Sequence, residues 1–161
     1  MARSTFVYVT YIRTTPKKLW SALTGDAEFM KQYWFGVHCE SQWTPGSSWK
    51  MVHADGHVSD AGEIVEAEPP RRLVILWRHQ DKPELKAEGE SRCTMELEPS
   101  GTAVKLCITH TIEREPSKLI AAVSGGWPKI LSNLKSLLES GSAVLQDPYP
   151  AARARQTEAA G

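Results

Sequence analysis

Hydrophobic residues alternate with polar ones in several short runs, which is the pattern of strands with one buried face. The runs that we predict to be strands are residues 5–13, 37–43, 48–53, 59–68, 72–79, 90–98 and 102–112. Turn-forming pairs such as Pro45-Gly46 and Asp55-Gly56 separate neighbouring runs. Closely spaced strands of this kind predict an antiparallel sheet rather than parallel strands joined by helices.

Two short helices are predicted between the first and second strands. Thr15 followed by Pro16 is typical of a helix start, and Gly25 ends that helix. Asp26 can cap a second helix, whose apolar residues include Trp34. Residues 81–86 are polar and are predicted to be a loop.

The last predicted strand indicates how the sheet is covered. Ile108 and His110 lie on its apolar face, and the polar face carries Lys105 and Thr109. Its hairpin partner alternates in the same way around Met95. One face of the sheet is therefore predicted to be covered and the other to face water.

A long amphipathic helix near the C-terminus is the predicted cover. Apolar residues recur at steps of three and four from residue 120 to residue 137. Pro128 removes a backbone donor, so we expect this helix to kink or restart there. Residues 140–161 are rich in alanine, proline and polar residues and are predicted to be a disordered tail. Residues 1–139 are then a single domain.

These elements predict an α+β protein with a helix-grip fold. In this fold a curved antiparallel sheet of six to seven strands wraps around a long C-terminal helix, with two short helices after the first strand. Because the sheet curves and the helix is straight, a gap between them is expected to hold a ligand.

The composition excludes several classes of partner. Lysine and arginine together number 19, as do aspartate and glutamate, so neither nucleic acid nor an anionic membrane is expected. No apolar segment has the length of a signal peptide or a membrane-spanning helix, which predicts a cytoplasmic protein without membrane insertion. The three cysteines are far apart, which favours reduced thiols. No dinucleotide or phosphate-binding motif is present, so no cofactor is predicted.

Several separated motifs carry a resemblance to a known family. They are VYVTYI (residues 7–12), TPKKLWSALT (15–24), GEIVE (62–66), PPRRL (69–73) and GWP (126–128). On these motifs the chain resembles bacterial proteins related to the activator of Hsp90 ATPase, of the START-like or Bet v 1-like superfamily, from residue 6 to residue 138. The resemblance implies a cavity between the long helix and the sheet, used in many members for sterols, lipids or polyketide-like aromatic compounds. The resemblance also suggests an Hsp90-type chaperone as a binding partner.

The candidate ligand-binding residues combine an apolar wall with polar groups that orient the ligand. We predict that they are Trp34, Trp77, His79, Met95, Ile108, His110, Trp127 and Leu131. His110, together with His79, would bond the polar end of the ligand, and the others would contact its apolar part. The alternative for His110 is a core histidine that neighbouring protein groups satisfy, and for Trp77 it is ordinary core packing. No catalytic residue is predicted.

A metal site is not predicted either. His53 and His57 flank the turn at Asp55-Gly56, and two histidines are too few for a convincing zinc site.

Three functions follow as hypotheses. The first is non-catalytic binding of a small hydrophobic or aromatic molecule. The second is an interaction module that activates an Hsp90-type chaperone, which a core closed by side chains would favour. The third is an enzyme of the cyclase or hydratase type, for which no residue spacing is diagnostic. The sequence leaves the oligomeric state open.

Overall fold

The computed structural model describes residues 2–145, which fold into one sheet and four helices. The elements in chain order are β1 (Ser4–Ile12), α1 (Pro16–Leu23), α2 (Ala27–Tyr33), β2 (His38–Ser41), β3 (Ser48–Val52), β4 (Val58–Glu68), β5 (Arg72–His79), α3 (Pro83–Lys86), β6 (Glu90–Ser100), β7 (Ala103–Ile112) and α4 (Lys118–Ser140).

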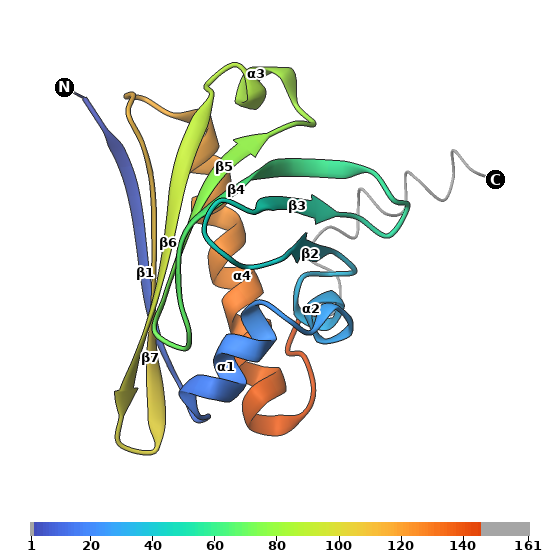
Figure 1. The fold of residues 1–161 in the computed structure, drawn as a ribbon, viewed down its shortest axis with the longest axis vertical. Coiled ribbons are helices and arrows are strands. Elements are labelled where there is room, and N and C mark those ends of the chain that lie inside the picture. Colours follow the sequence, from blue (N-terminus) through green and yellow to red (C-terminus); the bar gives the residue numbers. More distant parts are fainter. Residues whose placement is uncertain (1, 146–161) are drawn as a thin grey trace.

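The seven strands form one antiparallel sheet in the order β1-β7-β6-β5-β4-β3-β2. Each strand from β2 to β7 pairs with its neighbour in the chain, and β1 returns to pair with β7. The sheet curves strongly, and α4 runs along its inner side (Figure 1). The predicted α+β helix-grip architecture is confirmed.

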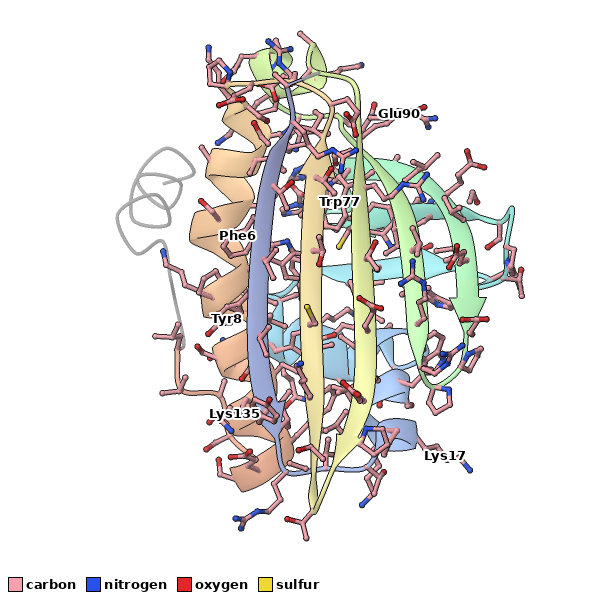
Figure 2. The ribbon with its side chains drawn as sticks, turned by 90° about the vertical axis from the view of Figure 1, so that its left-hand side faces the viewer. Phe6, Tyr8, Lys17, Trp77, Glu90 and Lys135 are labelled. Carbon is pink, nitrogen blue, oxygen red and sulfur yellow. The ribbon has the colours of Figure 1, made fainter. Side chains whose placement is uncertain are left out.

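Helix α4 lies beside β1, one of the two edge strands of the sheet (Figure 2). The Lys135 ammonium donates a hydrogen bond to the backbone carbonyl of Tyr11, and the amide of Arg13 donates one to the Glu139 carboxylate. These bonds tie the last turns of α4 to the end of β1. They give partners to backbone groups that an edge strand would otherwise leave unpaired.

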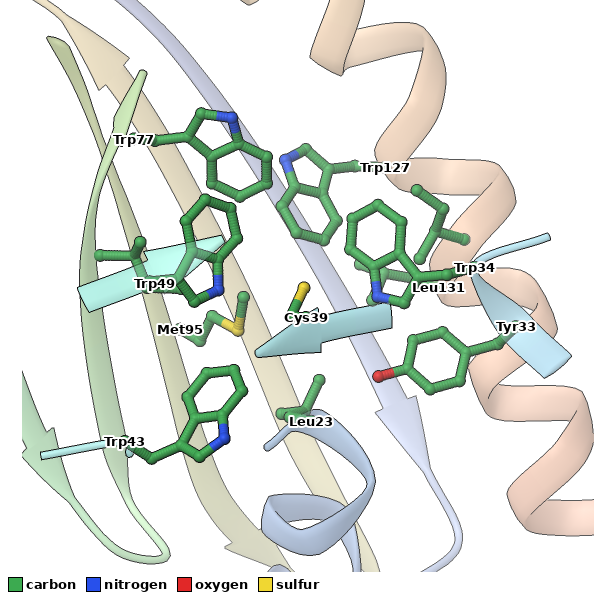
Figure 3. Close-up of a pocket in the computed structure, with 12 residues that line it drawn as sticks. Leu23, Tyr33, Trp34, Cys39, Trp43, Trp49, Trp77, Met95, Trp127 and Leu131 are labelled. Atoms are coloured by element: carbon green, nitrogen blue, oxygen red, sulfur yellow. The ribbon is translucent and has the colours of Figure 1, made fainter. Parts of the chain in front are cut away.

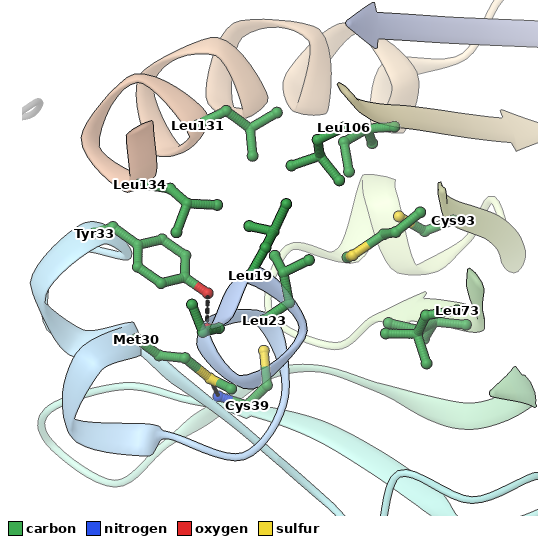
Figure 4. Packing of buried hydrophobic residues seen from close by; sticks show 14 of the residues in the cluster. Leu19, Leu23, Met30, Tyr33, Cys39, Leu73, Cys93, Leu106, Leu131 and Leu134 are labelled. Atoms are coloured by element: carbon green, nitrogen blue, oxygen red, sulfur yellow. Dashed lines mark hydrogen bonds between the residues drawn. The ribbon is translucent and has the colours of Figure 1, made fainter. Parts of the chain in front are cut away.

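The core lies between the inner face of the sheet and the helices (Figure 4). In β7 the buried residues Ile108 and His110 alternate with partly exposed ones, as the sequence pattern predicts. The two short helices begin where expected, because the side chains of Thr15 and Asp26 accept hydrogen bonds from Lys18 N and Phe29 N.

One element differs from the sequence prediction, because the predicted loop at residues 81–86 contains helix α3, whose Leu85 is buried against Ile112 and Leu119. Of the two outcomes expected at Pro128, a kink or a restart, the restart does not occur, since α4 continues through the proline as a single helix. Trp127 and Leu131, on either side of the proline, both pack into the core, and this packing keeps the two halves of the helix together despite the missing donor.

The chain beyond residue 139, where the single domain is predicted to end, is described as far as Leu145. Ser140 is the last residue of α4, and Gly141 ends the helix with a left-handed backbone, φ 85°. The chain then turns back, and the Asn133 side chain bonds both the amide and the carbonyl of Leu145. The rest of the predicted tail, residues 146–161, lies outside the described residues.

Within the described part of the chain, no helix combines the length and the hydrophobicity needed to cross a bilayer.

Candidate functional site

A pocket lined by aromatic side chains lies between α4 and the inner face of the sheet (Figure 3). We call it the aromatic pocket, and its lining residues are Leu23, Tyr33, Trp34, Cys39, Trp43, Trp49, Ile75, Trp77, Met95, Trp127, Ile130 and Leu131. Five of the six tryptophans of the chain are among them, and no lining residue carries a formal charge at neutral pH.

The pocket is almost filled by its own side chains. Its free volume is about 10 Å³, roughly the space of one water molecule. Four indole rings contact one another in series: the ring centroids are 5.5 Å apart for Trp34 and Trp127, 6.0 Å for Trp127 and Trp77, and 4.6 Å for Trp77 and Trp49. The gap expected between helix and sheet is therefore occupied by tryptophans in this structure.

His110 lies behind the pocket with both ring nitrogens bonded to protein groups. The Trp127 indole N–H donates to Nδ1 at 3.3 Å, and Nε2 lies 2.8 Å from the Ser91 hydroxyl. Because Nδ1 accepts a hydrogen bond, Nε2 carries the proton and donates to Ser91, whose hydroxyl donates in turn to the Trp77 carbonyl. Burial lowers the pKa of His110 to about 4, so the ring is neutral at physiological pH.

Asp60 accepts the indole hydrogen bond of a second tryptophan, Trp77. Its carboxylate is buried and accepts hydrogen bonds from the Trp77 indole N–H at 2.6 Å and from His79 Nδ1 at 3.1 Å. The Nε2 atom of His79 is buried without a hydrogen-bond partner among the described residues. His79 and Asp60 lie outside the pocket lining.

Trp49 differs from these two tryptophans because its indole N–H has no hydrogen-bond partner in the described structure, although its side chain is 2% exposed. The N–H faces the Cys39 thiol, a weak acceptor. Burial, together with the Asp60 carboxylate, raises the pKa of Cys39 to about 12, so the thiol is neutral. Burial also raises the pKa of Tyr33, whose hydroxyl donates to the Ala22 carbonyl.

One side of the pocket is built from a short segment with unusual backbone angles. Strand β2 has four residues and is the edge strand opposite β1. Phe35 precedes it with φ 54°, and Trp43 follows it with φ 59°. Bulky residues adopt positive φ rarely, at a cost of about 1–3 kcal/mol each. This wall is therefore held in place by its packing, including that of the half-buried Trp34 and Trp43.

The structure brings together five of the predicted site residues, Trp34, Trp77, Met95, Trp127 and Leu131, on the pocket wall. The other three, His79, Ile108 and His110, do not line it. Ile108 is completely buried in the core.

Sequence reasoning missed seven of the lining residues, which are Leu23, Tyr33, Cys39, Trp43, Trp49, Ile75 and Ile130. A signal for Trp49 was present, because Trp49 and Met51 alternate with polar residues in β3. Trp43 gave no comparable signal, since it lies in the loop after β2 and not in the strand predicted for residues 37–43.

The two histidines of the β3–β4 hairpin stack on each other, with ring centroids 4.3 Å apart. His57 bonds Asp55 and Asp81 with its two nitrogens, and the hydrogen bond to Asp55 raises its pKa. Within residues 2–145, no three His, Cys, Asp or Glu side chains are placed to hold a metal ion.

The model of the Activator of Hsp90 ATPase homolog 1-like protein family matches residues 13–139. The chain belongs to this family. The matched segment contains every residue that lines the aromatic pocket. Among curated proteins no significant match was found.

Solved structures support the Activator of Hsp90 ATPase homolog 1-like fold. Protein MLL2253 from Mesorhizobium loti has a TM-score of 0.72 at 23% identity, over 84% of this chain and 97% of that one. The Aha1 dimer from Colwellia psychrerythraea gives 0.69 at 19% identity, over 86% and 98%. PFC0360w, an HSP90 activator from Plasmodium falciparum, gives 0.67 at 23% identity, over 83% and 95%. At sequence identities this low, the structural similarity establishes the fold alone, and the function is inferred from the site.

Proposed function

We propose that this protein binds an uncharged small molecule with aromatic or other flat rings in the aromatic pocket. The observation that carries the proposal is the lining, in which five tryptophans, a tyrosine and apolar side chains surround a small void without any charged group. Flat rings gain apolar contact and favourable ring–ring geometry there.

Binding requires the pocket to open, because its free volume is about 10 Å³. The side that can open at least cost is the segment from Trp34 to Trp43. Its strand β2 pairs with a single neighbour, and positive φ angles flank it at Phe35 and Trp43. Displacing Trp34 would give a ligand access to the part of the Trp127 ring that Trp34 now contacts. The gain is about 25 cal/mol per Å² of apolar surface buried, less the cost of opening.

Fluorene, a flat and uncharged three-ring hydrocarbon, is a suitable probe for the pocket. In ¹⁵N-labelled protein we expect it to shift the indole N–H signals of Trp34, Trp49 and Trp127, and to leave that of Trp20 unchanged. Trp20 is the one tryptophan of the chain that does not line the pocket.

Trp34→Ala sharpens this test, since it removes a ring that closes the pocket. We expect this variant to bind fluorene about tenfold more tightly than the natural protein, because no ring must be displaced first. Trp20→Ala is the matched control, with the same deletion outside the pocket and no expected gain. Failure of both the natural protein and Trp34→Ala to bind fluorene would refute the proposal.

A second candidate function is contact with an Hsp90-type chaperone, which the family and the similarity to PFC0360w suggest. The observation in its favour is a stripe of exposed hydrophobic residues on the outer face of β1: Val7, Val9 and Tyr11 are 55%, 43% and 51% exposed. Such contiguous exposed residues are typical of protein contacts. The nearly closed pocket also fits this role.

The two candidates respond to different variants. Stimulation of the ATPase of a purified Hsp90-type chaperone should be lost in Val7→Ser/Tyr11→Ser and retained in Trp34→Ala. No stimulation by the natural protein would remove this second candidate.

A further inference from the structure

The polar atoms of the aromatic pocket restrict which molecules it can bind. Of the three deeply buried tryptophans in the lining, Trp77 donates its N–H to Asp60 and Trp127 donates to His110. Trp49 alone among these three has an indole N–H without a partner, at 2% exposure. In Figure 3 the nitrogen of Trp49 lies on the ring edge directed toward the sulfur atoms of Met95 and Cys39.

The groups around this N–H leave it unsatisfied. The Cys39 thiol is neutral and a weak acceptor, and its contact with the N–H is the smallest influence on the thiol pKa. This contact does not reach the geometry of a hydrogen bond. The thioether of Met95 is a weak acceptor as well. The Tyr33 hydroxyl is engaged with the Ala22 carbonyl. No oxygen of the described residues accepts the Trp49 N–H, and a buried donor of this kind is rare in folded proteins because leaving it unpaired is unfavourable.

We infer that the ligand carries a neutral oxygen acceptor, such as a ring carbonyl, which receives the hydrogen bond of the Trp49 indole N–H. The inference rests on the proposed function, since it names the class of molecule that the same pocket binds: uncharged polycyclic ketones and their relatives. A carboxylate does not fit, because no lining residue is cationic and a buried charge without a partner is strongly unfavourable. Fatty acids are thereby excluded, and His110 is not the group that binds the polar end.

Fluorenone and fluorene form the matched pair of probes for this inference. The two have nearly the same shape, and fluorenone adds one carbonyl oxygen. We expect the natural protein to bind fluorenone about tenfold more tightly than fluorene, the gain from one good hydrogen bond to a previously unpaired donor. The indole N–H proton of Trp49 should move downfield with fluorenone and not with fluorene.

Two variants separate the hydrogen bond from the loss of ring volume. In Trp49→Phe the preference for fluorenone should disappear. In Trp43→Phe, which shrinks another ring of the same pocket wall, the preference should remain. If Trp49→Phe does not fold, the Trp49 proton shift in the natural protein still decides the question.

The possible outcomes distinguish this inference from the proposed function. Equal affinity for fluorenone and fluorene, with no downfield shift at Trp49, would overturn the inference and leave ring binding intact. Binding of neither probe would overturn the proposed function and the inference with it.

Discussion

Trp127 and Trp49 face the same small void from opposite sides, one from α4 and the other from β3. They are equally buried, at 3% and 2% exposure. The Trp127 N–H donates a hydrogen bond to His110. The other nitrogen of His110 donates to the Ser91 hydroxyl, which donates to the Trp77 carbonyl. The Trp49 N–H is directed toward the sulfur atoms of Cys39 and Met95 and has no hydrogen-bond partner in the described structure.

This difference separates structural polar groups from candidate ligand-binding ones. A buried group whose hydrogen bonds are all made within the protein stabilises the fold and has nothing left for a ligand. A buried donor left unpaired lowers stability until something binds it. By this criterion we propose Trp49, rather than the sequence-predicted His110, as the group that bonds the polar atom of a ligand.

The largest expected effect is a loss of stability at low pH, caused by protonation of His110. The folded pKa of His110 is about 4, against 6.5 for a free histidine. The unfolded chain therefore binds the proton first as pH falls, and stability declines from pH 6.5 downward until the folded ring also titrates near pH 4. Because of His110, the free energy of unfolding should fall by about 3 kcal/mol between pH 7 and pH 4.

Urea unfolding of the natural protein and of His110→Gln at both pH values measures this cost. The stability advantage of the natural protein should shrink by that amount at pH 4, because glutamine does not titrate. An unchanged advantage would mean that His110 is already protonated, or is solvated, in the folded protein.

Replacing either tryptophan by phenylalanine compares the two sides directly. Both changes remove similar ring volume from a buried position. Trp127→Phe leaves His110 Nδ1 without its donor, whereas Trp49→Phe removes an N–H that has no partner. We expect Trp127→Phe to be the more destabilising by about 2 kcal/mol. Equal losses in urea unfolding would show that the Trp49 N–H is satisfied after all.

The smallest expected effect comes from giving Trp49 an acceptor within the protein. Cys39→Ser places a hydroxyl oxygen where the N–H points, and Cys93→Ser makes the same change at another buried cysteine. Burying a hydroxyl is normally unfavourable. We expect Cys39→Ser to cost about 1 kcal/mol less than Cys93→Ser, from the new hydrogen bond. A greater loss for Cys39→Ser would contradict the proposed orientation of Trp49.

The sequence pattern was sufficient for the sheet, because alternation in strands such as β7 directly reports which side chains are buried. It also placed the N-caps of α1 and α2, since Thr15 and Asp26 act through local hydrogen bonds. Helix α3 was missed because its stability comes from the tertiary burial of Leu85, to which local propensity gives no guide.

The site was less predictable, since it depends on how distant segments meet. That His110 faces inward follows from β7 alone. That both its nitrogens are bonded depends on Ser91 from β6 and Trp127 from α4. Whether the tryptophans surround a cavity or fill it depends on the relative placement of the helix and the sheet, and no local pattern encodes this.

The series of touching indoles also has an optical consequence. Trp34, Trp127, Trp77 and Trp49 follow one another with ring centroids 4.6–6.0 Å apart. Chromophores this close couple electronically, most strongly through their most intense absorption band. We expect the circular dichroism spectrum of the native protein to contain a contribution from this coupling that separate tryptophans would not give. A guest that separates two of the rings would change that spectrum without itself being chiral or coloured.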